Sequence, residues 1–147
     1  SEDRGRPASE ITNQIDVTRK ISTNSNGHIH WSAKSLVTNR GGIATKLANT
    51  YTQPSAIPAM PWVNNKPPGS PGVSASAASN GTTVAWVPDE RTAKIAIQAK
   101  TGGAWRTVKI AYLGANKSAT IPRADVIAVT ALDRYGNASP PKVLGLR

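Results

Sequence analysis

The stretch that decides the fold of the second half of the chain is NGTTVAW, from Asn80 to Trp86. Asn-Gly is a strong signal for a tight hairpin turn. The residues after it alternate, so that Val84 and Trp86 fall on one face of a strand. We therefore expect a β-hairpin at this point, with the Trp86 indole buried against a second sheet.

Short segments of the same kind lie on both sides of this strand. Each alternates or is rich in β-branched side chains, and turn-forming residues separate them. The other expected strands are 73–77, 95–99, 105–112, 118–121, 126–132 and 142–146. Short strands with turns at regular spacing are typical of an antiparallel, immunoglobulin-like β-sandwich. The sequence therefore predicts such a sandwich over residues 73–147.

Two motifs in this part resemble a fibronectin type III domain. They are Val84-Ala85-Trp86-Val87-Pro88 and the run from Val129 to Ser139. The resemblance covers residues 67–147 and implies a spacer or docking module. The sequence departs from the family near the start of the sixth strand, where Ile127 stands in place of the usual tyrosine, so the resemblance implies the sandwich without that tyrosine's contacts.

The sequence changes character at residues 63–72, which are rich in proline and glycine and predict an extended linker. Before this linker, apolar residues at helical spacing predict helices over 7–21 and 43–51. A short strand-like run, His28–Trp31, lies between them. The expected parts are a terminal α/β segment with a proline-rich strap (1–62), the linker (63–72) and the sandwich (73–147).

The first part cannot enclose a hydrophobic core of its own. A lone four-residue strand leaves its backbone groups without partners, and a separate domain of about 60 residues is already marginal in stability. We therefore expect residues 1–62 to dock on preceding chain, on the sandwich, or on a second copy by self-association.

Three motifs in this part resemble the last βα unit and closing strap of the (β/α)8 barrel in the bacterial glycosyl-hydrolase-like family 10. They are Gly27–Leu36, Asn39–Ala44 and Pro58–Trp62. The resemblance implies a C-terminal piece of a secreted, glycoside-hydrolase-like protein that acts on polysaccharide. It implies the rest of that barrel as the main partner. It also implies an extracellular, periplasmic or cell-surface location, with a lipid anchor in a missing N-terminal region as one form of attachment.

The acidic residues do not form the carboxyl pair that a glycosidase needs. None of the eight lies at the end of the barrel-like strand. We therefore expect no catalytic residue in this chain, and whether the whole protein is an enzyme depends on the preceding barrel. We expect no cofactor and no metal, although His28 and His30 share a strand face and would bind a metal if a third ligand came from elsewhere.

The candidate substrate-binding residues are Trp31, Ser32, Lys34 and Trp105. An exposed indole stacks on the apolar face of a sugar ring, and the loop residues Ser32 and Lys34 would hydrogen-bond its hydroxyls. Core packing, helix capping and surface polarity explain the same residues equally well. The alternative function is accordingly a stand-alone module that binds glycans or other polyanions.

The chain is basic, with 18 Lys and Arg residues against 8 Asp and Glu, and a net charge of +10. The excess is shared, because residues 1–66 carry +4 and residues 67–147 carry +6. A nucleic-acid binder usually clusters its cations on one face with aromatic residues between them. Here the cations occur singly, which disfavours nucleic acid as a partner and fits a solvated surface. No apolar run is long enough for a membrane-spanning helix.

Overall fold

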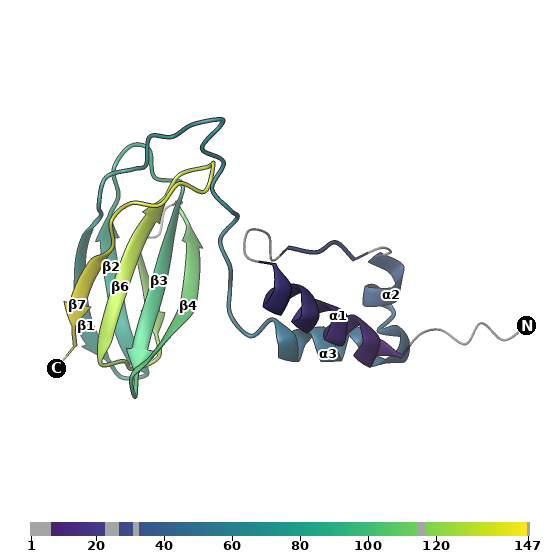
Figure 1. Cartoon of the computed structure of the whole chain (residues 1–147). Coiled ribbons are helices and arrows are strands. Elements are labelled where there is room, and N and C mark those ends of the chain that lie inside the picture. Colours follow the sequence, from purple (N-terminus) through teal and green to yellow (C-terminus); the bar gives the residue numbers. More distant parts are fainter. Residues whose placement is uncertain (1–6, 23–26, 31–32, 115–116, 147) are drawn as a thin grey trace, which may run out of the picture. The chain divides into compact units, whose positions relative to one another are not determined.

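The structure is a computed structural model that describes residues 7–22, 27–30, 33–114 and 117–146. The chain forms two compact units, Ser1–Thr52 and Gln53–Arg147 (Figure 1). We call them the first and the second unit and describe each by itself. The proline-rich residues 63–72 lie within the second unit.

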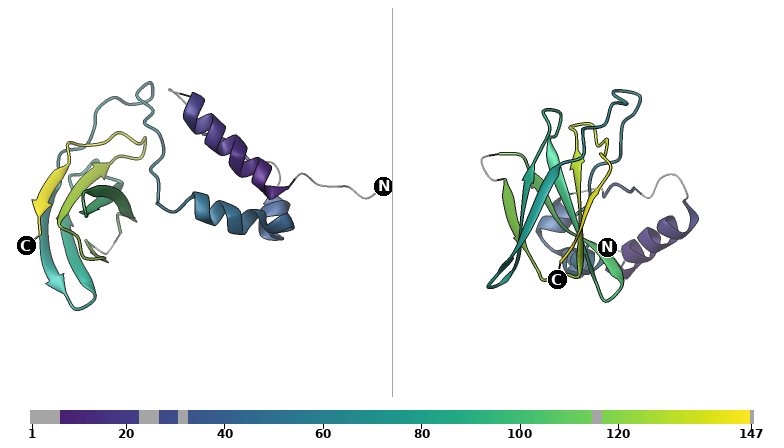
Figure 2. Two further views of the ribbon diagram at one scale, coloured as in Figure 1. Left: turned by 60° about the horizontal axis from the view of Figure 1, so that its bottom comes forward. Right: turned by 90° about the vertical axis from the view of Figure 1, so that its left-hand side faces the viewer.

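The first unit is helical (Figures 1 and 2). The helices expected over 7–21 and 43–51 are present and, in the described residues, no strand lies between them. The elements are α1 (Ala8–Ile21), α2 (Ala33–Val37), the 3-10 turn η1 (Arg40–Gly42) and α3 (Ile43–Thr50). Residues 28–30, the described part of the expected strand, are irregular, and no described strand of this unit lies beside them to pair with their backbone.

Local chemistry fixes the start of each long helix. Pro7 precedes α1 with a φ of −63°, which suits the entry to a helix. The side-chain oxygen of Asn39 accepts hydrogen bonds from the Ala44 and Thr45 N–H groups, at 2.9 and 3.3 Å. These N–H groups lie in the first turn of α3 and have no partner within the helix, so Asn39 stabilises its beginning.

The second unit consists of two antiparallel sheets, which confirms a mainly β, sandwich-like architecture (Figure 1). One sheet has the order β1-β2-β5 and the other the order β4-β3-β6-β7. Every strand expected over residues 73–147 is present, with small differences at its ends. The strands are β1 (Gly72–Ala78), β2 (Gly81–Val87), β3 (Lys94–Thr101), β4 (Ala104–Tyr112), β5 (Ser118–Ile121), β6 (Val126–Leu132) and β7 (Lys142–Gly145).

The core of the second unit lies between the two sheets and is built from alternate residues of four strands. The predicted burial of Trp86 is confirmed, because its side chain is 2% exposed. The other buried members are Val84, Ile95, Ile97, Ala99, Ile121, Ile127, Val129 and Ala131. This alternation gives each of these strands one apolar face, which the opposite sheet covers.

The predicted hairpin at Asn80-Gly81 joins β1 to β2, with Ala78 paired to Gly81. Gly81 also lies beside the end of β5, where a Cβ atom would overlap the carbonyl oxygen of Ile121. Glycine is therefore required at this position because β2 and β5 approach each other so closely.

Residues 53–71, which we call the strap, run from the edge of β4 to the start of β1. The Gln53 side chain accepts a hydrogen bond from the Thr107 N–H at 3.0 Å, and the Met60 N–H donates to the Tyr135 carbonyl at 2.9 Å. The Pro58–Trp62 motif, which resembles the closing segment of a barrel, therefore has its described backbone contact with the turn that follows β6.

Candidate functional site

The four residues predicted to bind substrate fall in different places. Trp31 and Ser32 lie outside the described residues. Lys34 lies on α2 in the first unit and is exposed. Trp105 lies on β4 in the second unit, and its side chain is 44% exposed. The structure therefore shows the surroundings of two of the four residues, Lys34 and Trp105.

Trp105 is the second residue of β4, directly after the Gly102-Gly103 turn and Ala104. It is the cross-strand partner of Lys100 on β3. Lys100 is next to Ala99, which points into the core, so Lys100 and Trp105 share the outer face of the four-stranded sheet. An indole beside a lysine on an open sheet face is suited to contact with a polar, ring-shaped ligand.

Two histidines and a tyrosine converge in the first unit. The His28 Nε2 atom is hydrogen-bonded to the Tyr51 hydroxyl, and the His30 Nε2 atom lies 3.4 Å from the same oxygen. The two histidine rings are 5.0 Å apart in an edge-to-face arrangement. The Arg19 guanidinium lies 5.6 Å from the centre of the Tyr51 ring. The sequence predicted that the histidines share a face, but gave no signal that Tyr51 joins them.

The Arg19 guanidinium places a positive charge beside this cluster. Burial lowers the pKa of His28, and the neighbouring His30 and Arg19 lower it further. Imidazole nitrogens and a phenol oxygen are donors that a transition metal accepts. Within the described residues, however, no third histidine, cysteine or carboxylate joins the two histidines.

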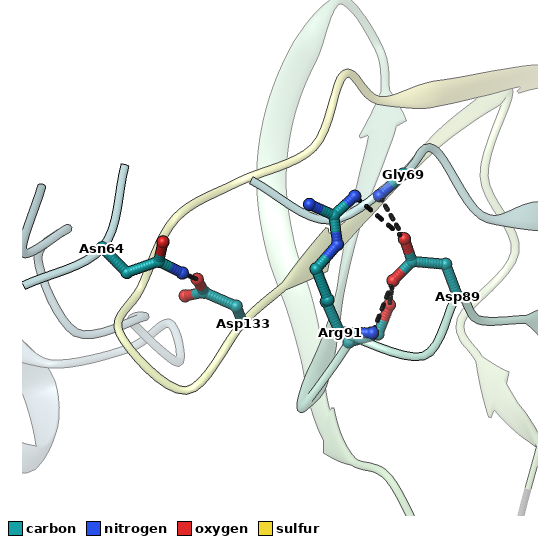
Figure 3. Close-up of polar contacts among 6 residues, drawn as sticks. Asn64, Gly69, Asp89, Arg91 and Asp133 are labelled. Carbon is teal, nitrogen blue, oxygen red and sulfur yellow. Dashed lines mark hydrogen bonds and ion pairs between the residues drawn. The ribbon is translucent and has the colours of Figure 1, made fainter. Parts of the chain in front are cut away.

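The buried Asp133 organises the turn after β6 and ties the strap to it (Figure 3). Its carboxylate accepts hydrogen bonds from the Tyr135 and Asn137 N–H groups at 2.8 and 2.9 Å. It also accepts from the side-chain amides of Asn137 at 2.8 Å and Asn64 at 3.3 Å. Burial by itself would raise the pKa of Asp133, but these hydrogen bonds outweigh it and lower the pKa.

Asp89 plays the same part at the turn after β2 (Figure 3). Its carboxylate accepts from the Gly69 and Arg91 N–H groups, both at 2.8 Å. The bond from Gly69 is the main reason why the pKa of Asp89 lies below its usual value. Both aspartates therefore serve turns and the strap. The adjacent Glu90 lines a hollow of about 410 Å³ next to Asp133, and Asp133 has no oxygen free for proton transfer.

A second hollow, of about 440 Å³, lies along the free edges of β4 and β5. We call it the edge groove. It is lined by Trp86, Lys109, Ile110, Ala111, Tyr112, Ser118, Ala119 and Thr120. These residues come from both sheets, and none of them carries a negative charge. The groove could not be predicted from the sequence, because its position depends on which strands form the edges of the two sheets.

One signal in the sequence does point to the groove. Residues 94–124 contain six Lys and Arg residues and no Asp or Glu. That run spans β3, β4 and β5, and the groove lies between the last two of these strands. In the sequence, evenly spaced cations indicate a solvated surface. Only the strand order shows that Lys94, Lys109 and Lys117 line or adjoin a groove.

Comparisons with known proteins add no assignment. No family model matches this sequence, and no curated protein matches it significantly. In the described part of the chain, no helix has the length and apolar character needed to cross a membrane.

Proposed function

We propose that this chain is the non-catalytic C-terminal part of a larger secreted glycoside-hydrolase-like protein that acts on polysaccharide. In this proposal the first unit completes a (β/α)8 barrel formed by preceding chain. The second unit is a fibronectin type III-like accessory or spacer module. The two barrel-like motifs of the first unit, Gly27–Leu36 and Asn39–Ala44, and the two sandwich motifs of the sequence support this proposal. The third barrel-like motif, Pro58–Trp62, lies in the second unit and does not support it.

One observation carries the proposal: the first unit has very little core. Its buried apolar residues are Ala8, Ile15, Ile43 and Leu47, with Ile11 and Leu36 partly buried beside them. A similar number of large apolar side chains of this unit are exposed to solvent. They are Val17 (52% exposed), Ile21 (75%), Ile29 (95%) and Val37 (85%). Helices this short gain most of their stability from tertiary packing, so these helices need a further surface to cover them.

Hydrogen exchange on the full chain tests the proposal. We expect the amides of α1 and α3 to exchange nearly as fast as those of an unfolded peptide, while β2, β3 and β6 stay protected. A longer chain that includes the sequence encoded upstream should bring α1 and α3 to the protection of the sandwich. Protection of α1 and α3 as strong as that of β3 in the chain alone would overturn the proposal.

A second candidate function is glycan binding by the second unit, and the exposure of Trp105 favours it. The test is binding of neutral and acidic oligosaccharides to Trp105→Ala, with thermal stability measured in parallel. Trp62→Ala is the matched control, because Trp62 is a 79% exposed indole on the strap. Loss of binding in Trp105→Ala alone, with an unchanged melting temperature, supports this candidate. Equal binding by both variants contradicts it.

A further inference from the structure

The edge groove has an unusual wall, because one of its lysines occupies an inward-facing position. Lys109 on β4 is paired with Ile97 on β3, and Ile97 is fully buried in the core. Directly paired residues lie on the same face of a sheet, so the Lys109 side chain starts toward the opposite sheet. Because β4 is an edge strand, its ammonium group reaches solvent at the groove.

Further cations flank the groove. The Lys94 ammonium lies 5.0 Å from the centre of the Tyr112 ring, and Tyr112 lines the groove. Lys117 directly precedes β5, and its carbonyl accepts a hydrogen bond from the Trp86 N–H at 2.9 Å. Three lysines thus belong to the walls or adjoin them, without an acidic residue in the lining. A groove with one sign of charge attracts ligands of the opposite sign.

The groove also offers neutral hydrogen-bonding groups. Ser118 and Thr120 contribute hydroxyls from β5, and both edge strands carry unpaired backbone groups. Trp86 lines the groove, and its buried Nε1–H has no acceptor among the described residues. A buried donor without a partner is rare and costly.

The edge is poorly suited to binding a peptide as an added strand. A β-bulge between Ile97 and Gln98 interrupts the pairing of β3 with β4. The Thr107 N–H is already donated to Gln53. Bulges and inward-pointing lysines are devices that protect sheet edges from further strands. A ligand held by scattered hydrogen bonds and charge fits this edge better than an extended peptide.

We propose that the edge groove binds an acidic polysaccharide, with Lys109 pairing with a uronic-acid carboxylate and the β5 hydroxyls contacting the sugar. This proposal goes beyond the second candidate function, because it places glycan binding in the edge groove and not at Trp105, which lies on the outer face of the four-stranded sheet. It does not depend on how the first unit is completed.

The first experiment is calorimetric titration of the full chain with an oligogalacturonate and with its methyl ester at 150 mM salt. The two ligands share a backbone and differ in charge. We expect the ester to bind at least about tenfold more weakly. This is the change in affinity expected from the loss of one charge-assisted hydrogen bond. Equal affinity for both ligands, or binding of neither, would overturn the proposal. The hydrogen-exchange test of the first unit is unaffected by either result.

The second experiment compares Lys109→Gln with Lys142→Gln. Both variants remove one positive charge, but Lys142 lies on β7, at the opposite edge of the four-stranded sheet. We expect Lys109→Gln to weaken oligogalacturonate binding about tenfold and Lys142→Gln to change it less than about twofold. Equal weakening would show a general effect of net charge and would refute the site.

Amide chemical shifts locate the ligand and separate the two glycan-binding hypotheses. On titration with oligogalacturonate we expect the amides of 109–112 and 118–120 to move most. Shifts confined to Trp105 and Lys100 would refute the edge groove while supporting the second candidate function. Tighter binding of poly-glutamate or of a single-stranded oligonucleotide at the same residues would also overturn the choice of ligand.

Discussion

Replacing Asp133 by asparagine tests how the strap and the turn after β6 are held together. Asp133 is 4% exposed, and its two carboxylate oxygens each accept two hydrogen bonds. In Asp133→Asn, the remaining oxygen still accepts the Tyr135 and Asn137 N–H groups. The new amide group then faces the side-chain amides of Asn137 and Asn64, which are donors themselves.

The structure sets the size of the effect. Two hydrogen bonds to a charged acceptor are lost, at about 1.5 kcal/mol each, so we expect a loss of about 3 kcal/mol in the free energy of unfolding. For a unit of this size, that corresponds to a fall of roughly 10–20 °C in melting temperature. The control is Asp125→Asn. The exposed Asp125 accepts one hydrogen bond, from the Gly102 N–H at 3.1 Å, and its replacement should cost less than about 1 kcal/mol.

Thermal and urea unfolding of the full chain, followed by circular dichroism in the β-sheet region, measures both variants. The hydrogen bonds lower the folded pKa of Asp133 below its ordinary value of 3.8, so its contribution is present above pH 3.8 and is lost as the pH falls through the lowered value. The difference between the original chain and Asp133→Asn should therefore narrow in acid. If Asp133→Asn is no less stable than Asp125→Asn at pH 7, the proposed role of this network is wrong.

Three further changes probe close packing and charge. Gly81→Ala should cost about 3 kcal/mol because its methyl group overlaps backbone of β5. Gly145→Ala, which meets open space, should be nearly neutral in the same urea titration. Gly136→Ala places a methyl group 2.7 Å from a strap carbonyl; the Met60 amide should then lose hydrogen-exchange protection, and unchanged protection would contradict this packing. In the longer chain, where we expect the first unit to be folded, the lowered pKa of His28 should make α1 and α3 lose hydrogen-exchange protection as the pH drops below 6.5. Protection that does not change with pH, or that changes equally in His28→Gln, would oppose this assignment.

The strands and the buried indole could be predicted because their signals are local. Alternation over a few residues and the Asn80-Gly81 turn determine which face of β2 is apolar, and Trp86 falls on that face. The helices α1 and α3 were predictable for the same reason, since their apolar residues recur at helical spacing. In each case, neighbouring residues carry the information that the sheet or helix uses.

The strap and the edge groove could not be predicted because they depend on contacts between distant residues. Met60 and Tyr135 are joined by one backbone hydrogen bond, which no spacing in the sequence indicates. The inward position of Lys109 follows from the bulge opposite β3. The strand expected at 28–31 is not confirmed, because its described residues, 28–30, are irregular. These residues favour a strand locally, but the described part of the first unit offers no strand to pair with.

The charge asymmetry of the second unit follows from its turn chemistry. Three of its four acidic residues bind backbone N–H groups at turns: Asp89, Asp125 and Asp133. Moving these carboxylates would leave those N–H groups without partners, so they are unable to serve as counter-ions on β3, β4 and β5. The lysines along the edge groove therefore remain without acidic neighbours in the lining. Replacing one of these lysines should change the free energy of unfolding only slightly. A change in ligand affinity would then reflect the loss of a contact to the ligand.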